Sequence, residues 1–201
     1  MTDRSRTPDL DAADRLTLLR LARSTLEAVM ARRAMPPEAA RGAPILDMRA
    51  SAFVTLEEAG ELRGCMGILE PDRPLRETVA EAARSAALRD PRFWPVEADE
   101  LDRITLEVTV LGPMVALDDP LDFDAPTEGV VVERGMRRAL LLPQVARERG
   151  WDAQATLEAV CHKAGLPGDA WRLPGTRVFA FGAVEAMEGD DGEDDAAGGE
   201  G

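Results

Sequence analysis

The segment ELRGCMGILE at residues 61–70 holds a cation, a thiol and two glycines within an otherwise apolar run. Side chains alternate between the two faces of a strand, so we expect Arg63 and Cys65 on one face, about 6–7 Å apart. A guanidinium near a thiol favours the thiolate, which is the nucleophilic form. Gly64 and Gly67 leave space for a ligand or for another backbone. The segment therefore predicts a small-molecule or anion site.

A structural interpretation of the same residues stays open. Free cysteine is among the most buried residue types, so Cys65 can serve as a small core side chain. Arg63 can then pair with a carboxylate, and Glu107, on the polar face of a strand expected at 103–112, is one candidate. In the chemical interpretation, Glu107 would instead carry a proton.

The second cysteine offers less chemistry. Cys161 lies on the apolar stripe of a helix expected at 152–164, which favours a core position. His162 is the only histidine, and consecutive helix residues do not face each other, so we expect no Cys161–His162 dyad. Two cysteines and one histidine are too few for a standard zinc cluster without carboxylates, and no phosphate-binding glycine loop or serine nucleophile motif occurs. We therefore predict no metal site, and the cofactor stays unknown.

Two further features could line a site. In the loop DPRFWP at residues 90–95, Arg92 can line a cleft, whereas Phe93 and Trp94 are expected to fill the core. Gln144 lies at the N-terminus of a short expected helix, where backbone N–H groups attract anions.

Helices and hairpins must position these residues. Apolar spacings of three and four predict helices, and alternation between turn residues predicts hairpins and single strands. The helices are expected at 10–33, 71–91, 143–150 and 152–164, the hairpins at 50–70 and 130–142, and the strands at 103–112 and 177–187. This mixture predicts an α+β fold with two α/β sandwich subdomains and mostly antiparallel sheets.

Composition limits the class of protein. A chain of 201 residues suits one domain or two small subdomains. The formal net charge is −14, and residues 185–201 carry eight acids and no base. We expect 1–8 and 185–201 to be disordered and 9–184 to form the domain. The acidic balance argues against duplex nucleic acid as a partner, because phosphates need a basic surface. The sequence has only two cysteines and shows neither an apolar secretory signal nor an apolar run long enough to span a membrane, so we expect a cytoplasmic protein.

Several longer motifs occur together and in a fixed order. They are FVTL, LRGCMG, DPRFWPV, EVTVL, EGVVVERG, LLLPQVARERGWD and CHKAGLPGDAW. With these motifs the chain resembles the AMMECR domain family from about Leu16 to Val184. The resemblance implies an α+β architecture of two subdomains, with the smaller inserted centrally, and no settled activity.

The resemblance also implies site residues and partners. The family's LRGC[IL]G hexapeptide, often suspected of forming a site, corresponds to residues 62–67, where Met66 replaces the usual Ile. Family members also tend to carry the residues that stand here as Arg92, Phe93, Glu107, Gln144 and Cys161. Bacterial and archaeal members are often called AmmeMemoRadiSam system protein A, which implies a Memo-like protein and a radical SAM protein as partners.

Three functions remain open from the sequence. The first is an enzyme or enzyme component in which Cys65 reacts, Arg63 lowers its pKa or holds an anion, and Glu107 carries a proton. The second is a non-catalytic adaptor that uses the RGC segment to bind a partner. The third, RNA or nucleotide binding, rests on the arginines of the second hairpin. The sequence favours a small-molecule site of unknown chemistry.

Overall fold

The chain folds into two compact units, each built from helices packed on an antiparallel sheet. The computed structural model describes residues 7–33 and 42–189. The large unit comprises 10–110 and 184–189, and the inserted unit comprises 7–9 and 111–183. The predicted α+β class with mostly antiparallel sheets is confirmed.

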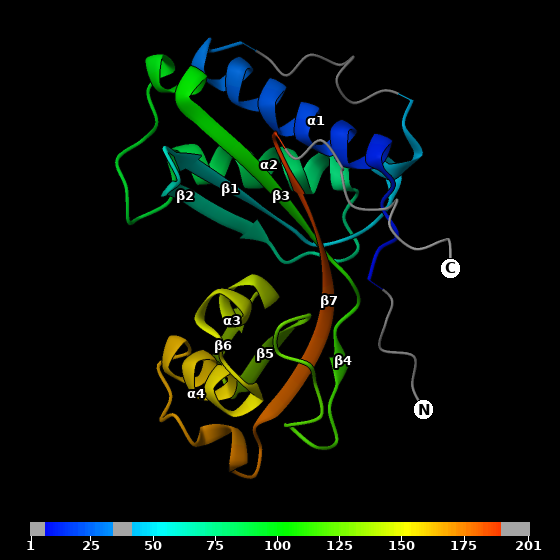
Figure 1. Ribbon diagram of the computed structural model, residues 1–201, viewed down its shortest axis with the longest axis vertical. Coiled ribbons are helices and arrows are strands. Elements are labelled where there is room, and N and C mark those ends of the chain that lie inside the picture. The colour runs from blue at the N-terminus through cyan, green and yellow to red at the C-terminus, as the bar shows by residue number, and fades with distance from the viewer. Residues whose placement is uncertain (1–6, 34–41, 190–201) are drawn as a thin grey trace, which may run out of the picture. The chain divides into compact units, whose positions relative to one another are not determined.

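The large unit combines two long helices with four strands (Figure 1). The helices are α1 (Ala12–Met30) and α2 (Leu75–Leu88), and the strands are β1 (Ala52–Glu58), β2 (Glu61–Ile68), β3 (Ile104–Leu111) and the C-terminal end of β7 (Arg177–Met187). The strand order is β2-β1-β3-β7, so β2 forms an edge. Short 3-10 helices at Pro44–Asp47 and Ala98–Arg103 were not predicted from the sequence.

Both long helices begin at residues suited to the position and bury one face. The Asp11 carboxylate accepts a hydrogen bond from the backbone N–H of Asp14, and Pro74 precedes the first turn of α2. α1 and α2 cover one face of the sheet and bury an apolar core against it. The core includes Leu18, Leu26, Val79, Val54 and Leu106.

The hairpin between β1 and β2 is tight and contains an irregularity. Ala59 and Gly60 both have positive φ, at 53° and 80°, as a two-residue hairpin turn requires. Leu56 pairs with Gly64, but Glu57 pairs with Leu62, so Arg63 is an extra residue in β2. This β-bulge interrupts the alternation of side chains along the strand.

The inserted unit has the same kind of architecture. Its strands are β4 (Val115–Ala116), β5 (Glu128–Arg134), β6 (Arg137–Leu141) and most of β7, and its helices are α3 (Pro143–Arg149) and α4 (Ala153–Lys163). β5 pairs with β6 and β7, and β4 pairs with β7, all antiparallel. A core that includes Val130, Leu157, Trp171 and Val178 lies between this sheet and α4. The two-residue β4 and the 3-10 helix Ala170–Arg172 were not predicted.

The strand expected at 177–187 forms with these bounds, and it overlaps the start of the tail expected at 185–201. β7 continues to Met187, and the Glu188 carboxylate pairs with Arg23 and accepts a hydrogen bond from the N–H of Leu106 at 3.0 Å. These partners order residues that composition alone assigned to the tail. Residues 1–6 and 190–201, where disorder was predicted, lie outside the described residues. Within the described ranges, none of the helices combines the length and apolarity needed to cross a membrane.

Gly64 sets how closely α2 approaches β2. A Cβ at this position would lie 2.4 Å from the backbone carbonyl oxygen of Ala86. The glycine therefore makes room for another backbone, which is one of the two uses expected for it. The Cβ that Gly67 lacks would meet the ring of Phe53, its cross-strand partner, at 2.3 Å.

We expect Gly64→Ala to lower the free energy of unfolding by about 1–3 kcal/mol, because α2 must move away from β2. Gly67→Ala is the matched comparison, and its cost should be smaller because the Phe53 side chain can rotate whereas a helix backbone cannot. Urea denaturation followed by circular dichroism measures both. A loss for Gly64→Ala no larger than that for Gly67→Ala would contradict the packing argument.

Candidate functional site

The candidate site lies on the sheet face of the large unit that the helices leave uncovered. Thr55 pairs with Cys65 on one side and with Glu107 on the other. Cross-strand partners share a face and lie about 5 Å apart, so the thiol, the hydroxyl and the carboxylate form a row across β2, β1 and β3. Val54 and Leu56, which flank Thr55, are buried in the helix-covered core.

The Cys65 thiol is half-buried and is a hydrogen-bond acceptor. The Thr55 hydroxyl donates to Cys65 Sγ at 3.3 Å. Burial raises the pKa of the thiol above its ordinary value of 9.0, and Glu107 and Asp90 add to this effect. The Thr55 hydrogen bond and the positive charge of Arg92 act in the opposite direction without reversing it. In the free protein, Cys65 is therefore a neutral thiol at neutral pH.

Asp90 fixes both the backbone at Cys65 and the cation next to it. Its carboxylate is buried, with a side chain 2% exposed, and accepts hydrogen bonds from Cys65 N at 2.9 Å and from Arg92 Nε at 2.9 Å. Arg92 Nη2 in turn donates to the carbonyl oxygen of Cys65 at 3.3 Å. The pair thus satisfies both backbone groups of Cys65 on the outer side of the edge strand β2. Arg92 lowers the pKa of Asp90 to about 2.

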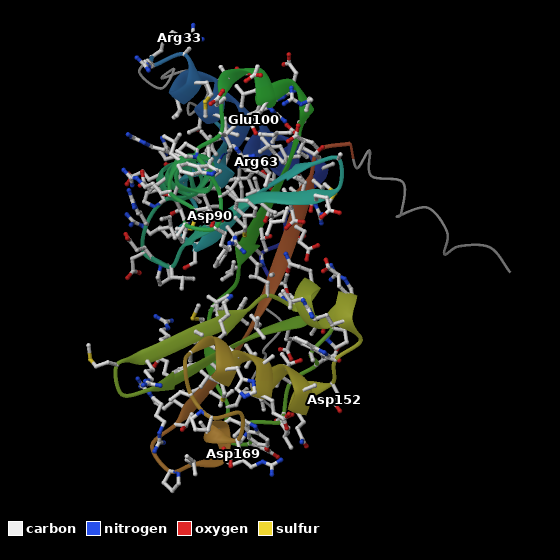
Figure 2. All side chains as sticks on the ribbon, turned by 90° about the vertical axis from the view of Figure 1, so that its left-hand side faces the viewer. Arg33, Arg63, Asp90, Glu100, Asp152 and Asp169 are labelled. Carbon is white, nitrogen blue, oxygen red and sulfur yellow. The ribbon has the colours of Figure 1, made fainter. Side chains whose placement is uncertain are left out.

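Arg63 does not take the place that strand alternation predicted. Its Nε and Nη2 bind the two carboxylate oxygens of Glu100 at 2.8 and 3.1 Å, and its Nη1 donates to the Trp94 carbonyl at 3.0 Å. Figure 2 labels Arg63 beside Glu100. The physical reason is the β-bulge, which turns the arginine away from the alternating pattern. The cation that acts on the Cys65 thiol is Arg92.

Glu107 has a different partner from the one considered in the sequence. Its carboxylate accepts a hydrogen bond from the Thr109 hydroxyl at 2.8 Å, whereas the Arg63 guanidinium is bound by Glu100. Glu107 keeps its place in the row beside Thr55. Thr109, on the next position of the same face, is buried.

The loop after α2 also departs from expectation at Trp94. This side chain is 88% exposed, whereas we expected it to fill the core. The core position is taken by Val96, whose N–H donates to the carbonyl of Ala87 and which is buried. Phe93 is half-buried, with the Arg92 guanidinium 5.4 Å from the centre of its ring.

The remaining predicted residues are spread over both units. Gly64 faces α2, and Gly67 lies under Phe53. Two of the predicted residues belong to the inserted unit: Gln144 is half-buried near the start of α3, and Cys161 lies on α4 and is fully buried in the core. Burial raises the pKa of the Cys161 thiol. Of the predicted residues, the structure brings Cys65, Glu107 and Arg92 to one region of the large unit.

Sequence reasoning missed Asp90 and Thr55. A signal for Asp90 was present, because an Asp before Pro favours a turn in which its carboxylate binds the N–H two residues on, as it does here with Arg92 N at 3.1 Å. Thr55 carried no signal, since its role depends on the register of the hairpin. Across 7–33 and 42–189, no group of three or more His, Cys, Asp or Glu side chains is arranged to hold a metal ion.

Asp90→Asn should destabilise the protein at neutral pH and make no difference in strong acid. A carboxyl whose pKa falls to about 2 in the folded state contributes stability above its ordinary pKa of 3.8, and this contribution is lost as the pH falls toward 2. The full difference should be on the order of 2 kcal/mol. Urea denaturation from pH 7 to pH 2 measures it, with the exposed Asp99→Asn as control. A difference between wild type and Asp90→Asn that does not shrink below pH 4 would refute the assignment.

Comparison with known proteins confirms the resemblance. A family model for AMMECR1 matches residues 19–186. A protein from Methanothermobacter thermautotrophicus is 48% identical over 149 residues, which cover 69% of this chain and 76% of that protein. A protein from Thermofilum pendens is 40% identical over 201 residues, with 89% and 92% covered. The crystal structure of an uncharacterised protein from Pyrococcus horikoshii is similar with a TM-score of 0.77 at 37% identity, covering 84% of this chain and 88% of that one. The chain belongs to the AMMECR1 family.

Proposed function

We propose that this AMMECR1-family protein binds a small molecule with an anionic group on the uncovered sheet face around Cys65. The observation that carries the proposal is the position of Arg92. Its side chain is 53% exposed, yet Asp90 and the Cys65 carbonyl hold it by Nε and Nη2. Within the described part of the chain its Nη1 makes no hydrogen bond, so a fixed guanidinium faces solvent beside the thiol.

The row across the strands supplies the other contacts of such a ligand. Cys65 and Glu107 flank Thr55, so one molecule lying across β1 can reach the thiol and the carboxylate together. The neutral thiol donates a weak hydrogen bond, and Glu107 accepts a proton or a hydrogen bond from the ligand. With its pKa raised, Cys65 is not an activated nucleophile before the ligand binds. The proposed role of the free protein is therefore recognition, and any chemistry follows binding.

Arg92→Gln should abolish retention of the small molecule. The native protein is purified at low salt, and mass spectrometry identifies the metabolites that remain bound to wild type and to the variant. Arg89→Gln is the matched control. Arg89 is also an arginine just after the C-terminal end of α2, but it pairs with Glu81. Equal retention by wild type and Arg92→Gln, or equal loss in both variants, would rule out the Arg92 site.

A second candidate, a non-catalytic adaptor, is favoured by Trp94. An aromatic side chain that is 88% exposed is unusual, and tryptophan is enriched among residues that dominate the energy of interfaces. The loop that carries it is anchored through the Trp94 carbonyl, which accepts from Arg63. In this proposal the Memo-like and radical SAM proteins that the family resemblance implies are the partners.

Trp94→Ala should reduce capture of a Memo-like or radical SAM partner by about tenfold or more, because loss of a buried interface tryptophan costs 2 kcal/mol or more. Pull-down with the tagged full-length chain measures the capture. Met136→Ala is the control, since Met136 is fully exposed in the inserted unit. Undiminished capture by Trp94→Ala would exclude Trp94 as the contact, and loss with both variants would show that the effect is not specific.

A further inference from the structure

A cavity lies on the helix side of the large unit, whereas Cys65 is on the opposite face of the sheet, which the helices leave uncovered. It measures about 630 Å³ and is formed by the C-terminal end of α1 and the outward side of α2. This volume is within the range of small-molecule sites. Its apolar lining is Ala28, Val29, Ala80 and Leu88.

The cavity is basic although the protein is acidic. Five arginines line it against two glutamates, in a chain whose formal net charge is −14. Both glutamates are already paired, Glu77 with Arg73 at 3.2 Å and Glu81 with Arg89 at 2.9 Å. The two carboxylates offset only part of the positive charge, and five arginines against two glutamates leave a formal excess of three positive charges in the lining.

Three of these arginines have side chains without a partner among residues 7–33 and 42–189. Arg73 is bound by Glu77 and Glu70, and Arg76 pairs with Asp47. Arg32, Arg33 and Arg84 line the cavity, and within the ranges that the structure describes their guanidinium groups form no ion pair or hydrogen bond. Figure 2 labels Arg33 at the end of α1. Three guanidinium groups that the described residues leave unpaired lie around one cavity and form an anion-binding arrangement, because each can bind an oxyanion with two parallel hydrogen bonds.

Arg32 occupies a backbone position that normally requires glycine. Its φ is 51°, and the hydrogen bonds from Arg32 N to Val29 O and from Arg33 N to Ala28 O end α1 in a Schellman motif. At the corresponding left-handed position, α3 and α4 carry Gly150 and Gly165. A non-glycine residue there costs stability. Arg32 therefore stands at a position where glycine would be the more stable residue.

A purely structural explanation covers only part of these observations. Cations after the last turn of a helix interact favourably with its dipole, which accounts for Arg32 and Arg33 at the end of α1. Arg84 lies in the middle of the exposed side of α2, where no helix terminus needs a cation. The feature that all three side chains share is therefore the cavity, because only two of them lie at a helix end.

We propose that this cavity binds a small organic phosphate. The phosphate groups of this ligand lie against Arg32, Arg33 and Arg84. Its apolar or aromatic part packs on the four apolar side chains that line the cavity and form its apolar floor. A di- or triphosphate presents enough oxygens for several guanidinium groups at once, which a single carboxylate does not. This site is independent of the one proposed around Cys65.

Isothermal titration calorimetry of the full chain with inorganic pyrophosphate and with ATP, at low salt and with EDTA, tests the proposal. We expect saturable binding of both probes, with ATP tighter because its adenosine contacts the apolar floor. Arg84→Gln and Arg33→Gln should each weaken pyrophosphate by about tenfold, the usual effect of losing a charged hydrogen bond. Arg20→Gln is the matched control, because it removes the same charge from an exposed position of α1 outside the cavity, and it should change the affinity less than twofold.

Arg32→Gly separates binding from folding. Glycine relieves the left-handed backbone, so the melting temperature should rise by about 2–4 °C while the affinity for pyrophosphate falls. No saturable binding by wild type, or an equal loss in Arg20→Gln and Arg84→Gln, would overturn the site. Citrate binding as tightly as pyrophosphate would overturn the choice of phosphate, and ATP no tighter than pyrophosphate would overturn the role of the apolar floor.

Discussion

The buried Asp90 carboxylate is the interaction on which the geometry around Cys65 depends. β2 is an edge strand, and its outward backbone groups have no neighbouring strand to pair with. Asp90 and Arg92 satisfy the N–H and the carbonyl of Cys65 with side chains instead. The same carboxylate orients Arg92, so one buried charge holds the strand edge, the loop after α2 and the cation beside the thiol.

This arrangement replaces the one that alternation along a strand suggests. The helices, the hairpins and the buried face of β3 follow from apolar spacing and turn residues, and the sequence predicts them well. The expected placement of Arg63 and Cys65 on one face of the strand is not found, because Arg63 is the bulged residue of β2. A bulge depends on the register in which two strands pair, and the residue pattern of one strand does not determine that register.

Two other differences have the same origin in long-range packing. Trp94 was expected to fill the core, but in this loop Val96 is the buried residue and Trp94 is 88% exposed. The acidic residues after 184 were assigned to a tail by composition, but Arg23 and the Leu106 N–H bind Glu188. Cys65 and Arg92 could be named from the sequence as candidates, whereas Thr55 acquires its role only through the register of β1 against β2 and β3.

The last strand gives the large unit an unusual order of assembly. The C-terminal end of β7 completes the sheet of the large unit and follows the inserted unit in the chain, while its neighbour β3 ends at Leu111. During synthesis on the ribosome, β1, β2 and β3 emerge long before β7, and until then the far side of β3 has no strand to pair with. Such an edge is prone to pair with another nascent chain. Completion of this sheet therefore waits until β7 has been translated, after β5, β6 and both helices of the inserted unit, and a chain that ended before Arg177 would keep that edge open.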